Sequence, residues 1–185
     1  MEELEMKKAT LVTVVVAMFM LFSQAAFAAD FVGGGIGFGF GKFNIVPNVV
    51  VDYNFNKNIS VNGWMGLQLV FDEDNKTQTN FMGTVFGRYN FHDQDDMTLG
   101  VQAGANISSN FTLAVGPFIS FDLNPNWTIY ADGSIGLLTT SGRAFDRGTI
   151  TAGAQYDLKS NLAIRGEYKL VNGRSMVIGT VGYIF

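Results

Sequence analysis

The chain has 185 residues, enough for one ordinary domain, and 48% of them are hydrophobic while only 15% are charged, against about 25% charged residues in typical soluble domains. Its formal net charge of −4 offers no basic surface for nucleic acid. Because cysteine is absent and His92 is the single histidine, disulfides, thiolate metal sites and cysteine nucleophiles are excluded, and little material is left for histidine-based catalysis.

Residues 1–28 are predicted to be a cleaved export signal. Two lysines precede the apolar run ATLVTVVVAMFMLF, and the small-residue pattern Ala26-Phe27-Ala28 follows it. A basic start, a short apolar core and an A-x-A site are typical of a secretory signal peptide. Cleavage after Ala28 would leave 29–185 as one exported domain. A retained membrane anchor is the alternative.

Beyond the signal, ten segments alternate apolar residues with polar or small ones, and short turns rich in Asn, Asp, Gly and Pro separate most of them. A period of two predicts β-strands. The predicted strands are 31–41, 48–55, 59–71, 79–91, 97–106, 111–123, 127–138, 147–158, 162–170 and 175–185. Most are close to the 9–11 residues with which a tilted strand crosses a bilayer. Pro117 lacks a backbone donor, so we expect a bulge or local break there.

The two faces of these strands differ in a way that favours a membrane barrel. One parity is almost purely apolar, whereas the other is mixed and often charged. A soluble barrel would bury the apolar parity, but a transmembrane barrel turns it to lipid and encloses a polar lumen. The charged residues expected in the lumen are Asp52, Arg88, Asp122, Asp132, Arg165, Glu167 and Lys169. Because both signs share a narrow space, we expect them to form an ion-pair network. A path for polar solutes is the alternative.

Aromatic residues lie beside the ends of the predicted strands. If the N-terminus starts in the periplasm, the turns near 56–58, 92–96, 124–126 and 159–161 lie on the periplasmic side. The expected periplasmic girdle is Tyr53, Phe55, Tyr89, Phe91, Phe121, Trp127, Tyr156 and Tyr183. The expected external girdle is Phe38, Phe40, Phe71, Phe81, Phe111 and Tyr168. Two aromatic belts around an apolar band are typical of membrane barrels.

Residues 33–43, GGGIGFGFGKF, match neither glycine spacing of a phosphate-binding loop. Their period of two indicates a strand whose lumen face carries only glycine, at Gly33, Gly35, Gly37, Gly39 and Gly41. Glycine weakens a strand, so we expect this bare wall to make room for long side chains such as Arg88, Arg165 or Lys169, or to permit sharp curvature.

The chain ends in VGYIF, and this ending, with Tyr183 and the terminal Phe185, is similar to the signal read by the outer-membrane barrel assembly machinery. Together with the export signal and the glycine-rich first strand, it resembles the small OmpA/OmpX-like, porin-like and opacity-type barrels of Gram-negative bacteria. The resemblance implies an all-β, antiparallel up-and-down transmembrane barrel in the outer membrane. Its implied partners are outer-membrane lipids, lipopolysaccharide and the assembly machinery. Ten strands are expected here, with the eight usual in those relatives as the alternative.

No catalytic, cofactor-binding or metal-binding residues are expected. Barrel enzymes of similar architecture use histidine at the external rim, whereas His92 falls in a predicted periplasmic turn. The acidic loop 72–76 is a weaker candidate for binding a divalent cation, and Arg143 and Arg147 are weaker candidates for binding lipopolysaccharide phosphates. The alternative for both is a loop whose charges are simply solvated. We expect a structural or surface-interaction role in the envelope. A narrow channel for ions or small polar solutes is the alternative, and a lipid-modifying enzyme is a second one.

Overall fold

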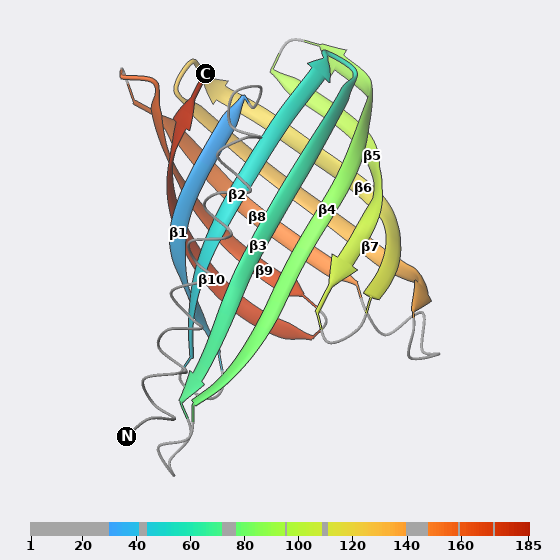
Figure 1. Ribbon diagram of the computed structural model, residues 1–185. Helices are drawn as coiled ribbons and strands as arrows, with labels where there is room; N and C mark the ends of the chain where they lie inside the picture. The colour runs from blue at the N-terminus through green and yellow to red at the C-terminus, as the bar shows by residue number, and fades with distance from the viewer. Residues whose placement is uncertain are drawn as a thin grey trace.

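The computed structural model describes residues 30–40, 44–71, 77–94, 96–108, 111–139, 148–158, 160–171 and 173–185. The predicted signal peptide lies outside these ranges. The described chain forms ten strands that close into a barrel (Figure 1). They are β1 (Phe31–Gly39), β2 (Asn44–Asn56), β3 (Ile59–Phe71), β4 (Thr77–Gln94), β5 (Met97–Ile107), β6 (Phe111–Asn124), β7 (Trp127–Thr139), β8 (Thr149–Asp157), β9 (Leu162–Val171) and β10 (Arg174–Ile184).

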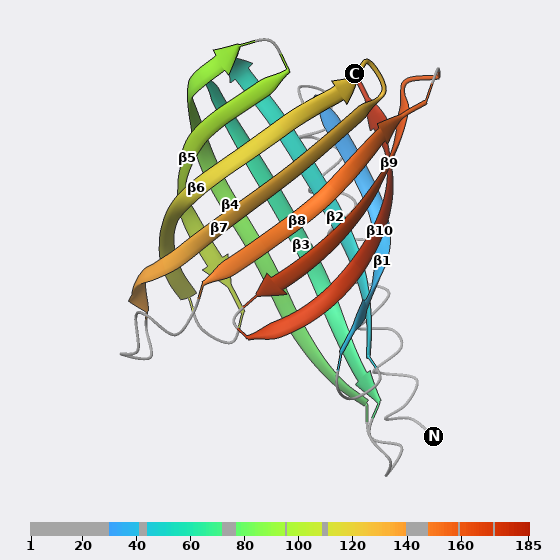
Figure 2. The ribbon, with the colours of Figure 1, turned by 180° about the vertical axis from the view of Figure 1, so that it is seen from behind.

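Every strand pairs antiparallel with its neighbours in the sequence, and β1 closes the barrel against β10, with Gly34 opposite Val181. The view from behind shows β5 to β10 as a continuous, tilted back wall (Figure 2). Phe185 donates its backbone N–H to the Asp30 carbonyl at 3.2 Å, so the two ends of the described chain meet. The predicted up-and-down barrel is confirmed with ten strands rather than eight. None of the described residues forms a helix long and apolar enough to cross a bilayer.

Two hairpins at the C-terminal end of the barrel, the end that carries Phe185, use the same turn chemistry. Asn56 Oδ1 accepts backbone hydrogen bonds from Asn58 and Ile59 at 2.9 and 3.0 Å. Asn124 Oδ1 accepts them from Asn126 and Trp127 at 2.9 and 3.1 Å. Asparagine favours such turns because its side chain replaces a backbone acceptor. The register shifts by one residue beside each of these asparagines.

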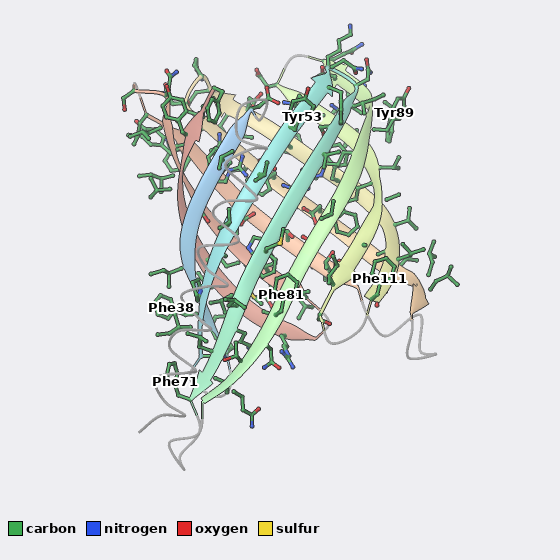
Figure 3. The ribbon with its side chains drawn as sticks, in the orientation of Figure 1. Phe38, Tyr53, Phe71, Phe81, Tyr89 and Phe111 are labelled. Atoms are coloured by element: carbon green, nitrogen blue, oxygen red, sulfur yellow. The ribbon has the colours of Figure 1, made fainter. Side chains whose placement is uncertain are left out.

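The distribution of side chains is that of a membrane barrel. Large apolar residues point outward and stay exposed, whereas buried Gln102, Asn106 and Thr112 lie inside. Phe38, Phe71, Phe81 and Phe111 mark the half of the barrel away from the C-terminus, and Tyr53 and Tyr89 lie near the C-terminal end (Figure 3). Apolar residues facing outward around a polar interior fit lipid as the surrounding solvent.

Of the bulge or local break expected at Pro117, the structure shows the break. Pro117 causes no bulge, because its register with β7 is the same on both sides (Val115 with Ile135, Phe118 with Asp132) and it stays aligned with Val101 of β5. No β7 partner is assigned to residues 116 and 117, so the ladder is interrupted without a shift. Strand β2 starts at Asn44 rather than 48, and β4 runs to Gln94.

His92 therefore lies in a strand and not in the predicted turn. A register shift between Asn90 and His92 lets β4 continue beside β5, where His92 lies opposite Leu99. This position is still near the C-terminal end of the barrel.

Candidate functional site: the barrel lumen

The glycine-rich face of β1 is occupied by short or rigid neighbours rather than by the expected long charged side chains. The ring of Phe31, which is only 3% exposed, lies against Gly33, where an added Cβ would be 2.8 Å from Phe31 Cζ. Thr180 lies next to Gly33 and Gly35, and Ile178 next to Gly37. Gly41 falls outside the described residues. The bare wall thus accommodates Phe31 and the inward side chains of β10.

Arg165 lies against Phe31, which in turn lies against Gly33 of the glycine wall. Its guanidinium lies 3.6 Å from the centre of the Phe31 ring and pairs with Asp52 at 2.5 Å. Asn62 donates to the same carboxylate, and Gln155 accepts from Arg165 Nε. This ion pair connects β9 to β2 across the lumen, since β10 and β1 lie between them in the wall.

Arg88 forms the second pair, with Asp132 at 3.0 Å. Gln102, which is 1% exposed, accepts from Arg88 Nε at 3.1 Å and donates to Asp132 Oδ1 at 3.3 Å. The Arg88 guanidinium also lies 5.0 Å from the centre of the Phe118 ring. This group connects β4, β5 and β7.

Lys169 forms the third and loosest pair, 3.8 Å from Glu167 Oε1. Tyr130 donates its hydroxyl to the same oxygen at 2.9 Å, and Lys169 lies 5.5 Å from the centre of the Trp64 ring. Lys169 and Glu167 are 5% and 6% exposed. The other carboxylate oxygen, Glu167 Oε2, is buried and has no hydrogen-bond partner.

Six of the seven residues expected in the lumen network therefore meet as three pairs, and Asp122 lies apart from them. Asp122 is exposed near the end of β6 and accepts from the Thr128 hydroxyl at 2.5 Å. It shares the inward parity of its strand but lies too close to the barrel end to meet a cation. Its placement corrects the expectation that it joins the network.

The three pairs border a polar cavity of about 170 Å³. Its lining residues are Asp52, Asn62, Arg88, Phe118, Ile119, Ser120, Thr128, Tyr130, Ala131, Asp132, Gln155, Arg165, Glu167 and Lys169. Next to it, Thr84, Phe86 and Val171 help to line a space of only about 10 Å³, which is scarcely enough for one water molecule. The open part of the lumen thus narrows sharply beyond Lys169.

Beyond this narrowing, toward the opposite end, a group of apolar side chains fills part of the lumen, and we call it the apolar plug. It consists of Val46, Trp64, Met82, Met176 and Ile178, each at most 1% exposed. Sequence reasoning did not identify it, because the inward parity was characterised by its polar members. These five residues nevertheless lie on the inward parity of their strands, so the signal was present in the sequence.

The aromatic residues predicted for the periplasmic girdle lie around the C-terminal end of the barrel. Phe55, Tyr89, Phe91, Phe121, Trp127 and Tyr183 are exposed, whereas Tyr53 and Tyr156 are half-buried. Three ring pairs form within this band: Tyr53 with Phe55 at 4.6 Å, Trp127 with Tyr156 at 4.8 Å, and Tyr183 with the terminal Phe185 at 4.9 Å. The last pair leaves the proposed assembly signal on the outer surface.

The loop candidates, 72–76 with Arg143 and Arg147, lie outside the described ranges. In the part of the chain that the structure describes, no three His, Asp or Glu side chains come together as a group that could hold a metal ion. Arg174, at the end opposite the C-terminus, donates to Gln68 at 2.6 Å.

Comparisons with known proteins agree with this architecture. Residues 14–183 match the family model of the outer membrane protein beta-barrel domain. The fold is similar to that of KdgM porin, with 12% identity over 84% of this chain and 99% of that chain at a TM-score of 0.51. It is also similar to the outer membrane protease OmpT from Escherichia coli, with 11% identity over 85% of this chain and 94% of that chain at a TM-score of 0.51. At these identities the likeness shows the fold alone. No curated protein sequence matches.

Proposed function

Since the chain belongs to the family of outer-membrane β-barrel proteins, we propose that it acts as a closed barrel with a structural or surface-interaction role in the envelope. Its place is the outer membrane of a Gram-negative bacterium. In this proposal the barrel catalyses no reaction, and its contacts are with outer-membrane lipids, lipopolysaccharide and, during biogenesis, the assembly machinery. The Phe185 end would face the periplasm.

The observation that carries the proposal is the occluded lumen. Each of Arg88, Arg165 and Lys169 has a carboxylate partner, so these three inward cations of the described strands form no unpaired stripe along a path for anions. The apolar plug occupies the far part of the interior with side chains that are almost fully buried. A barrel of ten strands is wider than the eight-stranded barrels whose side chains fill the interior, but far narrower than open porins of 16–18 strands.

A narrow channel is the second candidate, and a specific feature favours it. At the barrel end opposite the C-terminus, where the plug also lies, buried Asn106 on β5 and Thr112 on β6 have side-chain polar atoms without hydrogen-bond partners among the described residues. Buried polar groups are normally satisfied by protein or by ordered water. Water beside these two residues would extend the polar region past the plug.

Planar-bilayer conductance separates the two functions. The closed barrel should give no steady unitary current, whereas a W64A/M82A variant should conduct, because both substitutions remove plug side chains. W127A/V101A is the matched control, since Trp127 and Val101 face outward. Regular unitary steps from the unmodified protein would overturn the closed-barrel proposal. Conductance of the plug variant alone would also show that the preparation is inserted and folded.

The absence of catalysis needs its own assay. The refolded protein should leave labelled lipopolysaccharide and a labelled peptide mixture unchanged. Turnover that persists through purification and disappears on heat denaturation would contradict this part of the proposal.

A further inference from the structure

We propose that the polar cavity of the lumen is a binding site, closed at its inner end, for a small neutral polyol about the size of glycerol. The site goes beyond the structural role proposed above, because a closed barrel needs no ligand. Four features of the cavity lead to this inference: its position, its charge, an unpaired acceptor and its size.

The cavity lies in the half of the barrel near the C-terminal end. Ser120 and Thr128 line it, and they flank the turn that connects β6 and β7 at that end. At its inner limit, Lys169 contacts Trp64 of the apolar plug. Solutes therefore reach the cavity from the C-terminal end, and the plug and the narrow space before it limit passage further inward.

The charge of the lining selects a neutral solute. Three cations, Arg88, Arg165 and Lys169, line the cavity together with three carboxylates, Asp52, Asp132 and Glu167, so the sum is zero. Each cation is paired with one of the carboxylates. A charged solute would have to break one of these pairs or remain uncompensated in a poorly solvated space. A neutral molecule leaves all three pairs intact.

One carboxylate oxygen of a lining residue, Glu167 Oε2, lacks a hydrogen-bond donor among the described residues. Glu167 lines the cavity and is 94% buried, yet its Oε2 accepts no hydrogen bond. A buried carboxylate oxygen without a partner is costly. Because Oε2 is itself enclosed, a ligand hydroxyl donates this missing hydrogen bond once the Glu167 side chain turns toward the cavity. Ser120 and Phe118 also line the cavity, and a hydroxyl beside an aromatic ring suits a ligand with both hydroxyl and CH groups.

The volume limits the ligand to a small molecule. The cavity of about 170 Å³ is well below the roughly 300–1,000 Å³ of sites for drug-sized ligands. Glycerol has as many non-hydrogen atoms as benzene, which occupies an engineered cavity of about 150 Å³. Disaccharides are too large to enter. A three-carbon triol satisfies the size, the neutrality and the requirement for donors.

Ligand-observed saturation-transfer NMR with glycerol tests the site on the full barrel refolded in deuterated detergent. We expect transfer from the wild-type protein to glycerol. Ser120→Met should abolish it, because the longer side chain fills the cavity without touching an ion pair. Ser160→Met, at an exposed turn position near the same end, is the matched control and should leave transfer unchanged. Glu167→Gln should weaken it, since one oxygen acceptor is replaced by a donor.

A lack of transfer in the wild-type protein would mean that the cavity holds water only and would overturn the proposal. Equal transfer to the wild type and Ser120→Met would place the glycerol elsewhere and would also overturn it. Should Ser120→Met fail to fold, the cysteine-free sequence offers a second measurement. Glycerol should slow the reaction of Ser120→Cys with a small neutral thiol reagent, saturably, without slowing Ser160→Cys, while sucrose of equal viscosity slows neither. Equal slowing of both thiols, or of neither, contradicts the site.

Discussion

Gly34 and Gly35 are neighbours on β1 but should respond in opposite ways to alanine. At Gly35, on the lumen face, an added Cβ would overlap the backbone oxygen of Gly179 on β10 and lie 2.7 Å from Thr180 Oγ1. At Gly34, on the lipid face, the nearest atom to an added Cβ is the Asn48 backbone oxygen at 3.8 Å, which is ordinary contact. The two positions are adjacent on one strand and equally far from the barrel end, but they face opposite sides of the wall. The space for a methyl group is the difference that this comparison tests.

The magnitudes follow from two opposing effects. Replacing a strand glycine by alanine stabilises by about 0.5–1 kcal/mol, because the unfolded chain loses conformational freedom. Overpacking typically costs about 1–3 kcal/mol. The first effect is common to both variants and cancels in their difference. Gly34→Ala should thus be neutral or slightly stabilising, and Gly35→Ala should be less stable than Gly34→Ala by about 1–3 kcal/mol.

Equilibrium unfolding of the refolded barrel in lipid vesicles measures this difference. Guanidinium titration can be followed by the fluorescence of Trp64 and Trp127, and folding can be checked by heat-dependent migration on a gel. A difference of about 1.4 kcal/mol corresponds to tenfold in the unfolding equilibrium. Equal stability of the two alanine variants would refute the packing of β1 against β10 described above.

Three further predictions concern other parts of the barrel. Asp132→Asn should lower the free energy of unfolding by about 1–3 kcal/mol, because Arg88 loses its carboxylate in a largely buried site; a double variant with Arg88→Met should lose less than the sum, and additive losses would speak against the pair. Asp122→Asn should change stability by less than about 0.5 kcal/mol, as expected for an exposed position, and a larger loss in the same titration would place Asp122 in the network after all. Deleting Phe185 should reduce the amount of barrel in the outer membrane of cells but not refolding in detergent, because its ring is exposed; equal loss in both would assign it a packing role.

Most of the fold could be predicted from the sequence. The number of alternating segments gave the number of strands, and the parity within each segment gave its two faces. Outward Ile36 and Phe38 and inward Phe31 and Glu167 all have the predicted parity. Strand ends were less predictable, since they depend on pairing as well as pattern. His92 belongs to β4 because β5 provides a partner strand there. Pro117 is accommodated because only one side of its strand loses the ladder.

The contents of the lumen could be predicted only in part. The parity of Arg165 and Asp52 in their strands predicts that both side chains point inward. It does not predict that they meet, because β9 and β2 are far apart in the sequence. Their contact requires closure of β1 on β10 and a register that brings both to the same level. That level is set by the pairing of β2 with β1, of β1 with β10 and of β10 with β9. A pattern of period two is unchanged when a strand slides by two residues, so it does not determine this level.

The division of the lumen into a polar part and an apolar plug follows from chain direction. Strands β2 and β4 run toward the C-terminal end, and in each a buried apolar residue, Val46 or Met82, comes before the inward charge, Asp52 or Arg88. Strand β9 runs the other way, so Arg165 comes near its start at the C-terminal end and buried Val171 at its finish. Inward residues must therefore be compared after reversing alternate strands. Read in this way, the three ion pairs gather at one level and the plug residues at another, and the cavity and its closed inner end are consequences of the same pattern.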